Sequence, residues 1–117
     1  MTGLGPDGGT RPGEGSEVIE VTDHGDAGRY EVHVDGALAG YADRHVADGT
    51  MVLPHTVVDP RYRGRGLAAR LVRHALDDAR ARDLAVAPTC SYVADFLARH
   101  PDDLDLVPAP DRPRYGL

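Results

Sequence analysis

The sequence predicts an α+β (mixed α/β) fold, in which one long and one short helix cover a mostly antiparallel sheet of about five strands. Apolar and polar residues alternate in EVIEV and RYEVHV, and this period is typical of half-buried strands. The dipeptides Asp35-Gly36 and Asp48-Gly49 are turn signals between such stretches, because glycine accepts the positive φ of a tight hairpin. From Gly66 the apolar period becomes that of an amphipathic helix. The expected order is therefore β-β-β-β-α-β-α.

Four strands are expected before the long helix. The stretches 17–21 and 29–34 form the first two, ALAGYAD (37–43) forms a short third, and TMVLPHTVV (50–58) forms a more deeply buried fourth. Pro54 lies in the middle of this fourth strand. Since proline cannot donate a ladder hydrogen bond, it is confined to sheet edges and bulges. We therefore expect the sheet to split near Pro54.

The long helix is expected to begin after Gly66 and to end near Arg82. Its apolar residues recur at helical spacing and should face the core: Leu67, Leu71, Val72, Ala75, Leu76 and Ala79. LAVAP (84–88) then reads as a short buried strand. SYVADFLARHP (91–101) predicts a second, shorter helix that turns Val93, Phe96 and Leu97 inward and stops at Pro101.

Composition indicates one soluble domain with a tail at each end. A chain of 117 residues suffices for one domain, and 41% apolar and 27% charged residues are ordinary for a globular protein. Residues 1–16 are rich in glycine and proline, and residues 108–117 are rich in proline. Both segments are predicted to be disordered, which leaves 17–107 as the folded unit.

Charge and cysteine content limit the classes of binding partner and the cellular compartment that we expect. The formal net charge is -6, which argues against nucleic-acid or anionic-membrane surfaces, since both require a broad cationic footprint. Cys90 is the only cysteine, so no intrachain disulfide can form. No apolar leader segment is visible at the N-terminus, and we expect a cytoplasmic protein. The histidines other than His55 show no metal-ligand spacing, so no metal is expected.

The loop before the long helix, within DPRYRGRGLAARL, has the composition of a phosphate-binding site. The first helical N–H groups lack intrahelical partners, and the helix dipole adds positive charge there. Gly64 and Gly66 would let an anion approach these amides, and Arg61, Arg63 and Arg65 would add charge at the rim. The simpler alternative is a tight helix start with solvated arginines.

Two other phosphate motifs fit less well. A P-loop ends in Gly-Lys-Ser/Thr, and this chain has no lysine. GRGLAA fits the dinucleotide fingerprint G-x-G-x-x-A, but no acidic residue ends the next strand and the chain is too short for a doubly wound sheet. The remaining pattern is R-x-x-G-x-G, formed by Arg61, Gly64 and Gly66.

With this motif the chain resembles the GNAT superfamily of acyl-CoA-dependent N-acetyltransferases, whose pyrophosphate loop has this form between a bulged strand and a long helix. The run from His55 to Val107 is similar to the short, single-domain Yjdj-type branch. The resemblance implies a GNAT-like fold with acetyl-CoA as co-substrate, and a bulge at Pro54 that splays the fourth strand from LAVAP to leave a slot for the thioester. It also implies the cofactor-binding residues: Thr56, Val57 and Val58 for the pantetheine amides, and the backbone of Arg63, Gly64, Arg65, Gly66, Leu67 and Ala68 for the pyrophosphate.

Cys90 and His55 are the candidate catalytic residues. Cys90 lies at the start of the second helix, where free amides would favour a thiolate, and the resemblance places a cysteine at the mouth of the slot. A small buried hydrophobe is the alternative. His55, beside Pro54, could take a proton from the thiol or from an acceptor ammonium, or be hydrogen-bonded within the sheet. Tyr92 could protonate the departing CoA thiolate, as the resemblance suggests, or be a packed ring.

The principal hypothesis is an acetyl-CoA-dependent N-acetyltransferase acting on an unidentified amine, either a small molecule or a protein amine. Transfer would be direct, with His55 or water as base, or would pass through an acetyl group on Cys90. Longer family members have two further strands at the acceptor pocket, where this sequence has a proline-rich segment. A non-catalytic CoA-binding or interaction module is therefore an alternative, and a nucleotide-phosphate binder unrelated to CoA is another.

Overall fold

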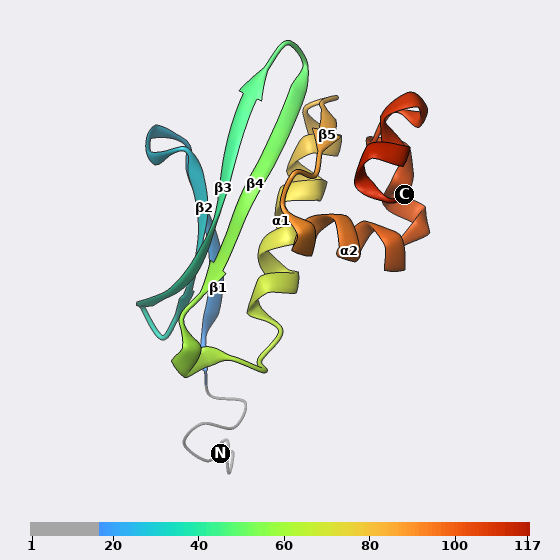
Figure 1. Cartoon of the computed structure of the whole chain (residues 1–117). Coiled ribbons are helices and arrows are strands. Elements are labelled where there is room, and N and C mark those ends of the chain that lie inside the picture. Colours follow the sequence, from blue (N-terminus) through green and yellow to red (C-terminus); the bar gives the residue numbers. More distant parts are fainter. Residues whose placement is uncertain (1–16) are drawn as a thin grey trace, which may run out of the picture.

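A five-stranded sheet and the helices on one of its faces form the two layers of the protein (Figure 1). The computed structural model describes residues 17–117, so the segment 1–16, predicted to be a disordered tail, lies outside the described residues. Among residues 17–117, no α-helix lies on the opposite face of the sheet (Figure 1). No helix in the described part of the chain is long and apolar enough to span a bilayer.

The sheet follows the order of the chain. Strands β1 (Ile19–His24), β2 (Arg29–Val34), β3 (Ala37–Ala47) and β4 (Thr50–Val58) pair antiparallel, and β5 (Ala85–Ala87) pairs parallel with β4. A short 3-10 turn, η1 (Gly25–Ala27), joins β1 to β2. Both predicted hairpin turns are present, and all four of their residues have positive φ, as a type I′ turn requires.

Helix α1 (Leu67–Ala81) packs on β2, β3 and β4 and contributes most of the helical residues of the core. The six residues predicted to face inward are the six that it buries. The shorter α2 (Ser91–Arg99) buries Val93, Phe96 and Leu97, as predicted. Tyr30, Val32, Met51 and Leu53 meet these helices from the sheet. A fully buried side chain of this size contributes roughly 1.5–3 kcal/mol through the hydrophobic effect, so this interface holds the two layers together.

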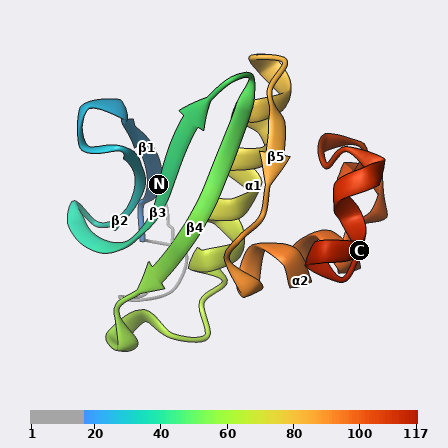
Figure 2. The ribbon, with the colours of Figure 1, turned by 45° about the horizontal axis from the view of Figure 1, so that its top comes forward.

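The sheet splits at Pro54, as the sequence predicted. The register passes from Asp43 opposite His55 to His45 opposite Val52, so two residues of β4, Leu53 and Pro54, oppose one residue of β3. This is a β-bulge, in which a proline needs no ladder donor. Strand β5 pairs only with the first three residues of β4, and Figure 2 shows the two strands diverging beyond that point.

The C-terminal segment differs from the prediction. Residues 108–117, expected to lack regular structure, contain the 3-10 helix η4 (Ala109–Tyr115). Arg112 Nε donates to the carbonyl of Val107 at 2.9 Å, and Tyr115 and Leu117 pack against the core. The fixed φ of proline, near −65°, lies within the range of a 3-10 helix. Prolines at the start of such a helix therefore favour it rather than prevent it.

A buried carboxylate joins α1 to the 3-10 helix η3 (Pro101–Leu106). Asp103 is only 7% exposed and accepts two hydrogen bonds from Arg73, at 2.7 and 2.9 Å. Arg80 approaches the same carboxylate at 3.3 Å. The Arg73 guanidinium holds the pKa of Asp103 below its usual range. Charge pairing at this site therefore fixes the C-terminal region against the long helix.

A second polar contact fixes α1 against the sheet. The Tyr30 hydroxyl donates to an oxygen of Asp78 on α1 at 2.5 Å, and the Arg44 guanidinium lies 4.5 Å from the centre of the Tyr30 ring. Burial and the bond to Asp78 raise the pKa of Tyr30. The phenol therefore remains a neutral donor at physiological pH.

Candidate functional site

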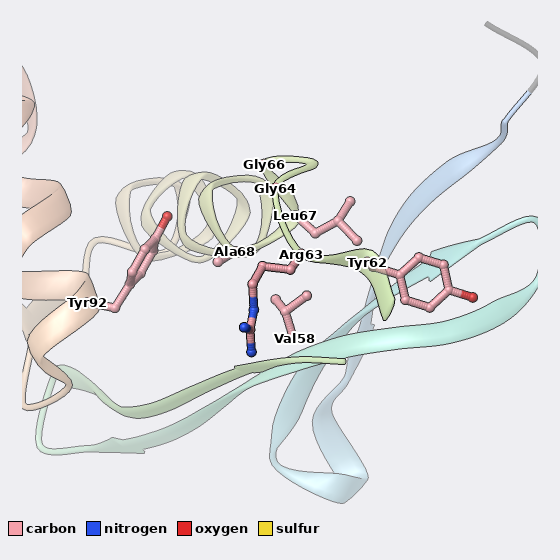
Figure 3. Close-up of a pocket in the computed structure, with 8 residues that line it drawn as sticks. All are labelled: Val58, Tyr62, Arg63, Gly64, Gly66, Leu67, Ala68 and Tyr92. Carbon is pink, nitrogen blue, oxygen red and sulfur yellow. The ribbon is translucent and has the colours of Figure 1, made fainter. Parts of the chain in front are cut away.

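A pocket of about 220 Å³ lies between the end of β4 and the start of α1 (Figure 3). Its lining residues come from β4, the following loop, α1 and α2: Val58, Tyr62, Arg63, Gly64, Gly66, Leu67, Ala68 and Tyr92. In Figure 3 the Arg63 side chain extends into the space between α1 and β4, whereas the Tyr62 ring turns away from it. The pocket thus combines an apolar wall with one arginine and the backbone of a glycine-rich loop.

Within the described residues, the amides of the loop after Arg63 and of the first turn of α1 have no backbone hydrogen-bond partner beside this pocket. Gly64 and Gly66 have φ of 82° and 73°, and a Cβ at either position would meet nothing within 4 Å. These glycines are therefore required by the left-handed backbone and not by packing. Gly66 directly precedes α1 and has no side chain to cap it. The first intrahelical bond runs from Arg70 N to Gly66 O, so the preceding amides are available to an anion.

The three loop arginines have different environments. Arg61 pairs with Asp59 at 2.9 Å, and Arg65 pairs with Glu17 at the head of β1. Neither arginine lines the pocket, although the sequence predicted both at its rim. Arg63 is the loop arginine that lines it. Sequence reasoning did not predict Tyr62 as a lining residue.

In the described part of the chain, one edge of β4 has no strand partner beyond the bulge. Asp59 N bonds to Ala39 O on β3, and the backbone groups of a strand alternate between its two edges. The N–H and C=O groups of Val57 therefore face β3, while those of Thr56 and Val58 face the edge that β5 has left. Of the predicted residues Thr56, Val57 and Val58, two can thus offer their backbone to an extended ligand.

Cys90 lies where β4 and β5 diverge. Its backbone N–H donates to Leu53 O at 3.0 Å, and the Thr89 hydroxyl lies 3.5 Å from the same oxygen. Cys90 is half-buried at the start of α2 and its side chain does not cap the helix. Instead, its Sγ lies 3.8 Å from Thr56 Oγ1, across the gap. The sequence did not indicate that the Thr56 side chain meets Cys90, because this contact depends on the bulge.

His55 does not share this environment. Adjacent strand residues point to opposite faces, and Thr56 points toward Cys90, so His55 points to the face without helices. It is exposed there and lies opposite Asp43 on β3. The structure therefore does not bring together the two predicted catalytic residues. Within residues 17–117, no three His, Cys, Asp or Glu side chains are grouped so that they could hold a metal ion.

A splayed pair of parallel strands, joined through a glycine-rich loop and a long helix, is the N-acetyltransferase fold. The ribosomal-protein-S18-alanine N-acetyltransferase from Escherichia coli superposes with a TM-score of 0.54 at 18% identity, covering 71% of this chain and 76% of that one. N-acetylglutamate synthase from Neisseria gonorrhoeae, solved with coenzyme A and N-acetyl-glutamate, gives 0.51 at 18% identity, covering 70% of this chain and 22% of that one.

A sequence model of the GCN5-related N-acetyl-transferases matches residues 29–106, and the chain belongs to this family. Protein NATD1 of Bos taurus is 38% identical over 64 residues, which are 55% of this chain and 53% of that protein. Protein NATD1 of Gallus gallus is 36% identical over 64 residues, covering 55% and 54%. The chain thus spans about half the length of the curated relatives it matches.

Proposed function

We propose that the protein is an acetyl-CoA-dependent N-acetyltransferase that transfers an acetyl group to an amine. The observation that carries this proposal is the continuity between two features. The pocket at the start of α1 offers Arg63 and free amides, and the unpaired edge of β4 leads from it to the gap beside Cys90. Acetyl-CoA has an anionic pyrophosphate, an extended amide-containing arm and a thioester. These three parts match the pocket, the edge of β4 and the gap beside Cys90, in that order.

The main chain would supply most of the contacts to the donor. Amides of the loop and of the first turn of α1 would hold the pyrophosphate, and Arg63 would add a charge-assisted contact. The free backbone groups of Thr56 and Val58 would pair with the pantetheine amides as a further strand does. A backbone N–H of β4 beside the gap would stabilise the oxyanion that forms on the thioester carbonyl.

The acceptor amine would arrive from the opposite face of the sheet. The pocket lies on the face covered by helices, whereas His55 points to the uncovered face. In the direct route, the imidazole of His55 or a water molecule takes a proton from the acceptor ammonium. The neutral amine then attacks the acetyl carbonyl, its nitrogen gives up a second proton to water, and the carbon–sulfur bond breaks to release CoA thiolate. Tyr92, which lines the donor pocket, would be placed to protonate that thiolate.

A covalent route through Cys90 is the second form of the same proposal. The Cys90 thiolate would attack the acetyl carbonyl and form a new thioester as CoA thiolate departs. The amine would then attack this acetyl-cysteine and regenerate the Cys90 thiolate. The support for this route is that Cys90 Sγ faces the gap in which the acetyl group would lie.

Titration calorimetry with acetyl-CoA, followed by a CoA-release assay with a panel of small amines and peptides, tests the proposal. Saturable binding together with amine-dependent CoA release that Arg63→Gln weakens is the expected result. Absence of binding at millimolar acetyl-CoA would refute the proposal. Binding without release with any amine would favour the non-catalytic CoA-binding module, and equal competition by ATP or NAD would favour a general nucleotide-phosphate binder.

Intact-mass measurement separates the two routes. Because the chain has no lysine, a mass gain of one acetyl group that hydroxylamine removes, and that Cys90→Ala abolishes, would identify acetyl-Cys90. If CoA release continues in Cys90→Ala but falls in His55→Gln, transfer is direct. A His55→Gln variant with full activity would assign the base to water.

A further inference from the structure

The gap between β4 and β5 is closed at its inner end by backbone contacts. Cys90 N and the Thr89 hydroxyl both approach Leu53 O, and Thr89 N bonds to Ala87 O at 3.0 Å. The segment that follows β5 is therefore held against β4 at the bulge. A ligand in the gap can enter from the direction of the pocket but cannot pass this bridge.

Two side chains meet just outside the bridge. Cys90 Sγ donates a weak hydrogen bond to Thr56 Oγ1 at 3.8 Å, so the two side chains are in direct contact. A carbon atom placed between them would need about 3.5–4.0 Å to each, roughly twice the distance that is present. The pair therefore forms a wall across the gap. Both residues are half-buried, so part of the wall is accessible.

The pocket and this wall are neighbours along both β4 and α2. Val58 and Tyr92 line the pocket, and each lies two residues beyond its wall residue, Val58 after Thr56 on β4 and Tyr92 after Cys90 on α2. A pantetheine arm that follows the edge of β4 inward from Val58 would bring its sulfur, and then the acyl group, against the wall. The contact between Thr56 and Cys90 would thus limit the length of the acyl group.

We infer that the contact between Thr56 and Cys90 sets the acyl-chain length, so that the slot takes an acetyl group and excludes an acyl group of four carbons. This inference rests on the proposed acetyl-CoA site. It assigns donor specificity to two side chains, whereas the remainder of the donor site is mainly backbone. Forcing extra methylene groups into a filled space typically costs about 1–3 kcal/mol, equivalent to roughly five-fold to more than 100-fold in Kd.

Thioether analogues test the inference without acyl transfer. Titration calorimetry would compare CoA, S-ethyl-CoA and S-butyl-CoA, because an alkyl thioether cannot pass its chain to Cys90 or to an amine. For the wild-type protein we expect CoA and S-ethyl-CoA to bind alike and S-butyl-CoA to bind at least about tenfold more weakly. Equal binding of S-butyl-CoA and S-ethyl-CoA would overturn the inference. Failure of CoA itself to bind would instead refute the proposed function.

Three variants assign the effect to the wall. Cys90→Ala and Thr56→Ala each remove one of the two contacting atoms, so each should bring the ratio of the S-butyl-CoA and S-ethyl-CoA Kd values to within about threefold of one. Thr56→Val has nearly the same volume and is the matched control, which should keep the wild-type ratio. If both alanine variants bind CoA and keep the wild-type ratio, another group limits the chain and the inference is wrong. Two alanine positions on different elements keep the test valid if one variant does not fold.

Discussion

Replacement of Gly64 by alanine should weaken CoA binding through the backbone alone. Gly64 has a φ of 82°, and a Cβ there would meet nothing within 4 Å, so the methyl group creates no clash within the protein. The left-handed conformation costs a non-glycine residue roughly 1–2 kcal/mol. Relief of this strain would rotate the loop amides beside the pocket. We therefore expect the free energy of unfolding to fall by about 1 kcal/mol and the Kd for CoA to rise about tenfold or more.

Gly49→Ala provides a matched control for the cost of strain. Gly49 has a φ of 76° and equally open surroundings, but it lies in the turn between β3 and β4, at the other end of β4 from the loop. Urea unfolding should show a similar loss of stability in both variants. Titration calorimetry with CoA should show weaker binding in Gly64→Ala only. An unchanged Kd in Gly64→Ala, or an equal rise in both variants, would refute the assignment of the loop amides to the pyrophosphate.

Three further predictions concern side chains. Arg63→Gln should raise the Kd for CoA about tenfold and reduce its salt dependence, whereas Arg65→Gln should change neither, as calorimetry at two salt concentrations would show. Asp103→Asn should lower the free energy of unfolding by about 2 kcal/mol in urea, less than a fully buried pair costs because Arg73 is 40% exposed. Since Arg73 lowers the pKa of Asp103, this contribution is complete above the unfolded value of about 4 and is lost as pH falls through the folded value. Tyr30→Phe should cost about 1 kcal/mol in the same unfolding assay, because it removes the hydroxyl bond to α1.

Each of these predictions has a clear contrary outcome. Equal effects of Arg63→Gln and Arg65→Gln would mean that the loop acts through general charge. An acid unfolding profile of Asp103→Asn that parallels the wild type down to pH 2 would exclude the carboxylate as a source of pH-dependent stability. An unchanged stability of Tyr30→Phe would show that water replaces the lost hydrogen bond.

The periodic elements could be predicted from the sequence because one physical constraint determines each. The inward residues of α1 follow from helical spacing, and the split of the sheet follows from the missing donor of Pro54. The arginines could not be assigned in this way. Arg65 pairs with Glu17, and a contact between residues so distant along the chain depends on the tertiary fold.

The orientation of His55 could not be predicted by counting residues along β4, because the bulge changes the alternation of side chains. Met51 and Leu53 are buried against the helices, so strict alternation along β4 would turn His55 to the same side. The extra residue at Leu53 and Pro54 reverses the alternation, and Thr56 takes that orientation instead. The sequence indicates a proline-marked irregularity, but only the register shows that it inserts one residue.

The bulge also separates two kinds of recognition within one strand. On the helix side, the donor would be held mainly by peptide groups, which are the same whatever side chains a strand carries. On the uncovered side, any acceptor would meet side chains alone, across a sheet face that bears no helix. Substitutions on that face can therefore change the acceptor while the donor site is retained. A scaffold of this kind can acquire new substrates through mutations that leave its cofactor chemistry intact.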